Sequence, residues 1–309
     1  MTAVLRKELA DYFTSIRFII FFVLTLFAAA AGLIAASQGI RQLNLPPDFV
    51  FLGLYTTSGT AIPSLVSLLA LLIPLIGIAL GFDAINSERT GGTLSRLLSQ
   101  PLFRDSVING KFLAGVVTLA VMIATVMGLV AGYGLRMIGV PPNPEEIIRL
   151  FIYFVLTVFY GAFWLGLAML FSVVMRRIAS SLLVCIGIWL FFRIFILLIA
   201  PAIANAIAPI SQNSPEAEII RNANLRGMIM RISPNTLYAE AMGALLLPQV
   251  VGSLGVISTS QASFMIANPL SLTQSLLLIW PHLTSLISLS AVCFAISYVL
   301  FMRQEIRPT

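Results

Sequence analysis

The stretch FIIFFVLTLFAAAAGLIAA, residues 18–36, decides the fold, because it runs for 19 residues without a charged side chain. An α-helix needs about 20 apolar residues to cross the hydrocarbon core of a bilayer, which is about 30 Å thick. The run exceeds the 7–15 apolar residues of a secretory signal peptide, and Glu8 and Asp11 precede it. We therefore expect a retained first transmembrane helix.

Five more apolar runs of similar length follow. Over 309 residues, 59% are hydrophobic and 10% are charged, whereas soluble globular chains have about 25% charged residues. These features predict an all-α membrane protein with six transmembrane helices, and residues 18–309 form this domain. We expect the six spans at Phe18–Ser37, Ile62–Phe82, Phe112–Leu135, Leu150–Val174, Ser181–Ile203 and Leu276–Met302.

Residues 1–17 form a separate N-terminal segment with helical periodicity. Leu5, Leu9, Tyr12 and Ile16 recur at the spacing of one helix face, and the opposite face carries Arg6, Lys7, Glu8 and Asp11. This pattern predicts an amphipathic helix lying in the membrane interface. A solvated leader without a fixed position is the alternative.

The distribution of Lys and Arg indicates the orientation of the chain. Counting short loops and termini, eleven basic residues fall on the side of the N-terminus and three on the other. Basic residues favour the cytoplasmic side, so we expect both termini in the cytoplasm and the chain in the cell (inner or plasma) membrane. Because these residues lie beside apolar runs, they suit contact with membrane lipid rather than nucleic acid. The eleven are Arg6, Lys7, Arg17, Arg89, Arg96, Arg104, Lys111, Arg176, Arg177, Arg303 and Arg307, and the three are Arg41, Arg136 and Arg149.

The cytoplasmic loop between the second and third spans, residues 83–111, is the most informative segment. Thr93 can cap a short helix over Leu94–Ser99, which must end before Pro101. A helix of one or two turns is not stable alone, so its apolar face must dock, either on the protein's own spans or on a cytoplasmic partner. This face consists of Leu94, Leu97 and Leu98.

The same loop resembles the first cytoplasmic loop of type-2 ABC transporter permeases, whose pattern is E-x-x-x-G-T-L-x-x-L-L-S-x-P-x-x-R followed by G-K-F. The segments Arg6–Leu9 and Ser233–Tyr238 are also similar to this family. Within this family, the chain resembles the subgroup that includes the permease of the nitrous-oxide reductase maturation transporter. Matching positions in the loop are Glu88, Gly92, Thr93, Leu94, Leu97, Leu98, Ser99, Pro101, Arg104, Gly110, Lys111 and Phe112.

The resemblance implies a six-span exporter subunit that pairs with a second copy, as a homodimer, and with two ATP-binding subunits. It also implies that the helix after Gly92 is a coupling helix seated on the ATPase. The chain has no G-x-x-x-x-G-K-[ST] phosphate loop, so we expect no catalysis, cofactor or metal here, and ATP and Mg²⁺ in the partner. The expected ATPase contacts are Glu88, Arg89, Gly92, Thr93, Leu94, Leu97, Leu98 and Arg104.

Two basic side chains lie inside the predicted spans. Arg193, in the fifth span, either serves a substrate pathway or helix pairing, or extends its side chain to the membrane surface. His282 is the only histidine, and a lone histidine favours interfacial hydrogen bonding over metal binding.

The external segment, residues 204–275, is long enough to have its own structure. Its apolar stretch Tyr238–Leu247 is too short to span and predicts an interfacial or re-entrant helix. Such a helix would form a gate or a docking surface for an extracytoplasmic partner.

Three functions remain open at the level of sequence. An ATP-driven permease of the ABC-2 type, acting as an exporter, is the main prediction. An ion-coupled secondary transporter is disfavoured, since the spans lack paired carboxylates and an inverted repeat. An ATP-driven membrane assembly factor that moves no substrate needs the same loop as a permease. No residue in the spans indicates which substrate is transported, and a lipid, a peptide or a drug would each suit an apolar pathway.

Overall fold

The computed structural model describes residues 2–40, 50–59, 62–92, 103–139, 141–210, 215–247 and 270–303, and all regular secondary structure in these ranges is helical. Six helical segments are long and apolar enough to cross a membrane, which confirms the prediction of six spans. They are Ile16–Gln38, Leu65–Thr90, Arg104–Met137, Pro144–Val174, Ile178–Ile207 and Leu272–Arg303.

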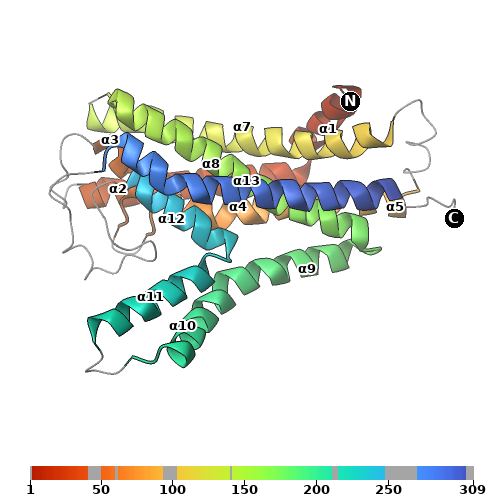
Figure 1. Ribbon diagram of the computed structural model, residues 1–309. Helices are drawn as coiled ribbons and strands as arrows, with labels where there is room; N and C mark the ends of the chain where they lie inside the picture. Colours follow the sequence, from red (N-terminus) through yellow and green to blue (C-terminus); the bar gives the residue numbers. More distant parts are fainter. Residues whose placement is uncertain are drawn as a thin grey trace.

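The spans are built from long helices, and shorter helices connect them (Figure 1). The span-forming helices are α2 (Ile16–Ile40), α4 (Leu65–Gly81), α7 (Arg104–Ile138), α8 (Pro144–Val174) and α13 (Leu272–Arg303). The fifth span consists of α9 (Ile178–Leu190), the π-helix η2 (Phe191–Phe195) and α10 (Ile196–Ile207). The shorter helices are α1 (Thr2–Thr14), α3 (Val50–Thr56), α5 (Asn86–Thr90), α11 (Glu216–Met230) and α12 (Pro234–Leu246).

The core of the bundle forms where α4 crosses α8. A Cβ atom placed on Gly77 would lie 2.8 Å from the carbonyl oxygen of Gly161, and one on Gly81 would lie 2.7 Å from that of Leu165. Only glycine permits such an approach of two helix backbones. Gly77 and Gly81 form a G-x-x-x-G pair, a spacing typical of closely packed membrane helices. Trp164, fully buried, fills the space beside this contact.

The two ends of the bundle differ in composition. Figure 1 shows α1, α5 and the last turn of α13 at one end, which we call the α5 end. The opposite end carries α3 and the C-terminus of α12, and we call it the α3 end. The start of α2 contacts the residue just after α4, the start of α7 contacts α1, and the end of α8 contacts the start of α5, all at the α5 end. The four helices α2, α4, α7 and α8 therefore alternate in direction.

The fifth span diverges from the bundle. In Figure 1, α9 starts beside α8 at the α5 end and leads away from the other spans, and α10 and α11 pair with each other at the side. No side chain of η2 is buried, and Leu183 and Leu198 are 70% and 65% exposed. An apolar flank of this size must be covered by lipid or by another chain.

Three features of the connections differ from the sequence-based expectations. α7 begins at Arg104, so the last part of the expected loop 83–111 belongs to the third span. α3 was not predicted, and its Tyr55 is buried and donates to the carbonyl oxygen of Met127 at 2.9 Å. α12 covers the expected short helix but starts earlier, at Pro234, and most of it is buried against α8 and α13. Its apolar surface is therefore covered mainly by protein.

Candidate functional site

The candidate site lies at the base of the loop that links α4 to α7, where α5 is anchored on α8. The backbone N–H groups of Ile85 and Asn86 both donate to the Ser172 hydroxyl oxygen, at 2.9 and 3.1 Å. These two donors lie at the start of α5, where helix N–H groups have no partner within the helix. A single buried hydroxyl near the end of α8 thus fixes the position of α5.

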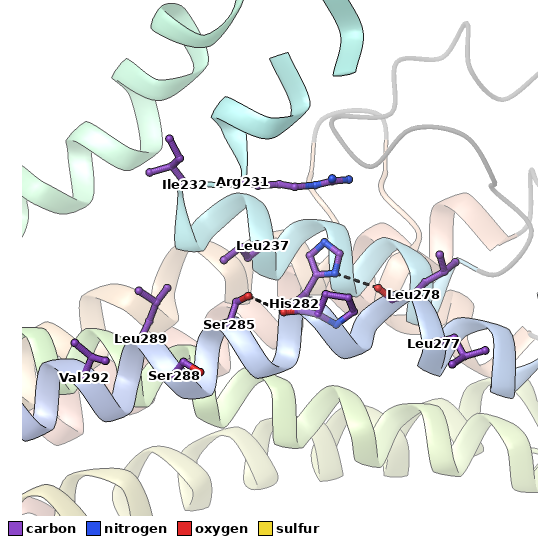
Figure 2. A pocket seen from close by; sticks show the side chains of 11 residues that line it. Arg231, Ile232, Leu237, Leu277, Leu278, His282, Ser285, Ser288, Leu289 and Val292 are labelled. Carbon is purple, nitrogen blue, oxygen red and sulfur yellow. Dashed lines mark hydrogen bonds between the residues drawn. The ribbon is translucent and has the colours of Figure 1, made fainter. Parts of the chain in front are cut away.

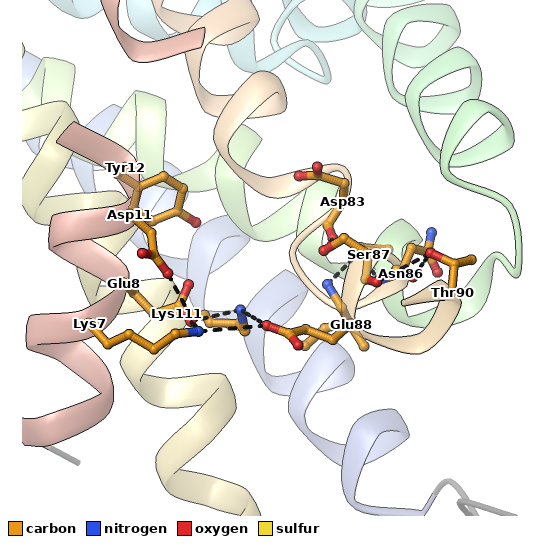
Figure 3. A network of polar contacts seen from close by, with 12 residues as sticks. Lys7, Glu8, Asp11, Tyr12, Asp83, Asn86, Ser87, Glu88, Thr90 and Lys111 are labelled. Atoms are coloured by element: carbon orange, nitrogen blue, oxygen red, sulfur yellow. Dashed lines mark hydrogen bonds and ion pairs between the residues drawn. The ribbon is translucent and has the colours of Figure 1, made fainter. Parts of the chain in front are cut away.

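A buried cluster of charges joins α5 to two other helices (Figure 3). The Nζ atom of Lys111, on α7, lies 2.9 Å from an oxygen of Glu8, on α1, and 3.4 Å from an oxygen of Glu88, on α5. The side chain of Lys111 is 5% exposed. Because a buried charge is costly unless it is paired, Lys111 depends on both carboxylates.

Lys7 and Asp11 extend the same cluster toward solvent. The Nζ atom of Lys7 lies 3.4 Å from Asp11, 3.5 Å from Glu8 and 3.9 Å from Glu88. Partial burial lowers the pKa of Lys7, but the three carboxylates outweigh burial and hold this pKa above its ordinary value. The cluster therefore holds two cations and three carboxylates from three helices.

A second set of contacts ties α1 and α2 to the end of α4. Arg17 pairs with Asp83, and its guanidinium lies 5.2 Å from the centre of the Phe82 ring. The Tyr12 hydroxyl donates to the carbonyl oxygen of Leu80 at 3.0 Å. Burial, and then the charges of Glu8 and Asp83, raise the pKa of Tyr12, so the hydroxyl keeps its proton.

The close fit of α1 against α7 explains how these charges meet. A Cβ atom on Gly110 would lie 2.8 Å from a methyl carbon of Val4, so the two helices touch at this glycine. The sequence pattern placed Glu8 on a polar, outward face, whereas the structure buries Glu8 beside Val4. Leu5, Leu9 and Tyr12 are partly buried.

Four of the eight expected ATPase-contact residues lie in the described ranges. Glu88 and Arg89 are on α5, Gly92 follows it with φ of +64°, in the left-handed region that favours glycine, and Arg104 begins α7. The structure thus brings Glu88 into the charge cluster. The others, Thr93, Leu94, Leu97 and Leu98, lie outside the described residues.

Several residues of this site were not predicted from sequence. Glu8 and Lys111 belong to the segments that resemble the ABC-2 permeases. They are 103 residues apart, so the sequence does not indicate that they form an ion pair. Ser172 carried no signal at all, since a serine near the end of an apolar span is unremarkable in sequence.

Arg193 lies within η2, near the middle of the 30-residue fifth span. It is exposed. π-helices of a single turn occur often at functional sites. The hydroxyl of Ser233, just before α12, donates to the carbonyl oxygen of Phe192 at 3.2 Å, which links η2 to α12.

Arg149 holds the opposite end of the bundle together. This fully buried guanidinium pairs with Glu145 at 2.7 Å. It donates to the carbonyl oxygens of Leu245 and Leu270 at 2.7 and 2.8 Å and to the Ser275 hydroxyl at 3.0 Å. α8, α12 and the start of α13 are therefore joined through one side chain.

Comparison with known proteins identifies the family. Residues 2–306 match the family described as ABC-2 family transporter protein. The chain is 35% identical over 141 residues to the "Probable ABC transporter permease protein NosY" of Pseudomonas aeruginosa, and 31% identical over 144 residues to the protein of the same name from Stutzerimonas stutzeri. Each match covers 45% of this chain and 50% of the relative, so the chain spans about half the length of these relatives. The match over nearly all its residues shows that the chain belongs to the ABC-2 family of transporter proteins.

Proposed function

We propose that this chain is the permease subunit of an ATP-driven ABC transporter and works as an exporter. Two copies would pair with each other and with two ATP-binding subunits that supply ATP and Mg²⁺. Family membership supports the permease role and argues against an ion-coupled secondary transporter. The names of the two relatives support it as well.

The cluster of Glu8, Glu88 and Lys111 is the observation that carries the proposal. The loop after Gly92 would receive the movement of the ATPase, and Glu88 lies at the base of that loop. Because Lys111 contacts Glu88 and Glu8 together, a displacement of α5 pulls on α7 and α1 at once. Separating buried ion pairs is costly, so the three helices would move as one body.

The diverging fifth span supports a dimer. Its exposed apolar flank provides a surface that a second copy can cover, and this flank contains Arg193. An intramembrane arginine is a functional candidate by default, since its charge must be paired or hydrated. In the proposed dimer, Arg193 faces the pathway between the two permeases.

The charges at the two ends support the proposed orientation in the inner membrane. In the described ranges, the α5 end carries Arg6, Lys7, Arg17, Arg89, Arg104, Lys111, Arg176, Arg177 and Arg303. Arg136 and Arg149 lie at the α3 end, and Arg221, Arg226 and Arg231 lie on α11 and directly after it. The larger number of basic residues at the α5 end favours the cytoplasmic side. The α5 end would then face the ATPase, and α11 and α12 would lie near the external side, where a gate or an extracytoplasmic partner would act.

Co-purification with the cognate ATP-binding subunit tests the proposal. We expect Leu94→Asp and Leu97→Asp to abolish the complex, because each buries a carboxylate in an apolar contact. Ile147→Asp makes the same change at an exposed residue at the α3 end and should leave the complex intact. If both loop variants keep the complex and its ATP hydrolysis, the assignment of the loop as ATPase contact is wrong.

Transport into inverted vesicles separates an exporter from an assembly factor. An intact complex that hydrolyses ATP but moves none of a panel of lipids, peptides and drugs would favour the assembly factor.

A further inference from the structure

A pocket of about 780 Å³ lies between α12 and α13, away from the proposed ATPase contact (Figure 2). Arg231, Ile232 and Leu237 line it from α12 and the turn before it. His282, Leu289 and Val292 line it from α13. The volume falls in the range typical of ligand sites, and the lining is mostly apolar, with Arg231 and His282 at one end and two serines along α13.

The polar groups at that end belong to a triad whose carboxylate is hidden. Glu240 is 2% exposed at its side chain and does not line the pocket. The Arg231 Nε–H donates to its Oε2 atom at 2.9 Å, and the His282 Nε2 atom lies 2.7 Å from the same oxygen. The two nitrogen-bearing side chains therefore face the pocket and the carboxylate lies behind them.

The positive charge that faces the pocket belongs to Arg231. The His282 ring lies between two oxygen atoms, with Nδ1 3.1 Å from the carbonyl oxygen of Leu278 and Nε2 2.7 Å from Oε2 of Glu240. The guanidinium of Arg231 stays charged whichever tautomer this ring adopts.

The guanidinium of Arg231 has N–H donors that this triad does not use. Within the described ranges, the two terminal nitrogens of Arg231 have no hydrogen-bond partner, and neither does the hydroxyl of Ser288, an exposed residue that also lines the pocket. Guanidinium groups bind phosphate with two parallel N–H donors. The site therefore suits an anionic group with several oxygen atoms.

The position of α13 in the membrane places the triad at a boundary. Arg303, at one end of α13, must stay near a membrane surface, and about 20 residues span the hydrocarbon core. Counting back from Arg303 places His282 at the opposite surface. Trp280 is 64% exposed at this level, where tryptophan is enriched.

The apolar part of the pocket has the length of one leaflet. His282 and Val292 are ten residues apart on α13 and both line the pocket. At about 1.5 Å per residue this distance is about 15 Å. Half of a hydrocarbon core of about 30 Å has the same depth.

We propose that this pocket binds an anionic phospholipid of the leaflet at the α3 end. The phosphate contacts the terminal nitrogens of Arg231, and one acyl chain lies along α13 past Leu289 to Val292. The guanidinium of Arg231 selects the headgroup, and the apolar wall holds the chain. The site is distinct from the proposed ATPase contact and does not depend on it.

Native mass spectrometry of the purified full chain tests this proposal. The chain is equilibrated with equal amounts of palmitoyl-oleoyl phosphatidylglycerol and phosphatidylcholine, and bound lipids are counted. We expect preferential retention of phosphatidylglycerol, and a loss of this preference by about fivefold in Arg231→Gln. Arg226→Gln removes the same charge from an exposed position on α11 and should change nothing.

A second pair of variants tests the chain-binding wall. Leu289→Trp fills the pocket and should reduce retention of both lipids. Ile287→Trp is the control: it adds the same bulk on the opposite face of α13 and should leave lipid retention unchanged. An identical elution profile on size exclusion shows that each variant is folded.

Three results would overturn the proposal. The first is an equal effect of Arg226→Gln and Arg231→Gln. The second is displacement of the lipid by inorganic phosphate alone, which would indicate a site for a small anion. The third is a shift of Leu289→Trp from dimer to monomer without loss of lipid, which would show that a second copy fills the pocket. The measurement uses no ATP-binding subunit, so its failure leaves the proposed transport function untouched.

Discussion

At the level of single residues, Lys111 shows how much one buried cation contributes to the stability of the α5 end. It is the least exposed basic residue of the charge cluster and the only member on α7. Its two carboxylate partners are themselves mostly buried. The cost of losing Lys111 therefore lies less in the lost attraction than in the two carboxylates left behind.

We expect Lys111→Met to destabilise the protein by about 3 kcal/mol, because Glu8 and Glu88 then repel each other in a buried space. Unfolding of the purified chain by increasing denaturant measures this loss. The double variant Glu8→Gln with Lys111→Met removes one of the two carboxylates left behind, and with it their mutual repulsion, so it should be more stable than Lys111→Met alone. Purely additive effects would contradict the coupling.

Arg149 makes the corresponding contribution at the α3 end. We expect Arg149→Lys to weaken the attachment of α12, because one ammonium cannot reproduce the planar set of donors to Leu245, Leu270 and Ser275. The measurement is hydrogen–deuterium exchange, which should become faster in residues 234–246. Unchanged exchange there would show that α12 is held by its apolar contacts alone.

At the level of elements, α4 and α8 can cross closely because the glycines at their contact have no side chain. Gly77 and Gly81 allow the two backbones to touch, and the buried side chains around them are packed on that contact. A methyl group inserted between two helix backbones cannot be accommodated by rotating a side chain, because the neighbouring atom is a carbonyl oxygen.

Gly81→Ala should therefore destabilise the protein by about 1–3 kcal/mol. Gly128→Ala on α7 is the matched control, since a Cβ atom there meets nothing within 4 Å. That control should be neutral or stabilising by up to about 1 kcal/mol, because alanine is the better helix former. Equal melting temperatures for the two variants would rule out the close packing.

The fifth span matters at the scale of the whole molecule because it leaves the bundle. Its π-helix and its intramembrane arginine lie on an element with an exposed flank, and Ser233 links that π-helix to α12. A pathway between two copies would use this flank.

We expect Arg193→Leu to lose most of the ATP-dependent transport of the reconstituted complex, whereas Arg193→Lys retains a large part of it, because the pathway needs the charge. If Arg193 only reaches the membrane surface, transport by Arg193→Leu stays at the wild-type level. Co-purification of the ATP-binding subunit with each variant shows that the complex is still assembled.

The sequence predicted the spans well because a bilayer imposes a length that is visible in the apolar runs. The same reasoning misplaced charged residues that are buried in protein. Arg149 was counted as a loop charge and Glu8 as part of a polar face, yet both are buried. Arg149 has a partner in Glu145, four residues away, and Glu8 has one in Lys7, but their other partners are distant in sequence or are backbone carbonyls, which no pattern of residue types reveals. The pairing of Glu240 with His282 could not be predicted for the same reason, because the two residues are 42 positions apart.

The coupling of Glu8 to Lys111 also sets an order of events during synthesis. The two residues are separated by 103 positions, and chains grow at about 5–20 residues per second, so Glu8 leaves the ribosome roughly 5–20 s before its partner. Throughout that interval α1 has neither the lysine nor the glycine surface of α7 against which it packs. The N-terminal helix, although made first, can therefore take its final position only once the third span has begun to emerge.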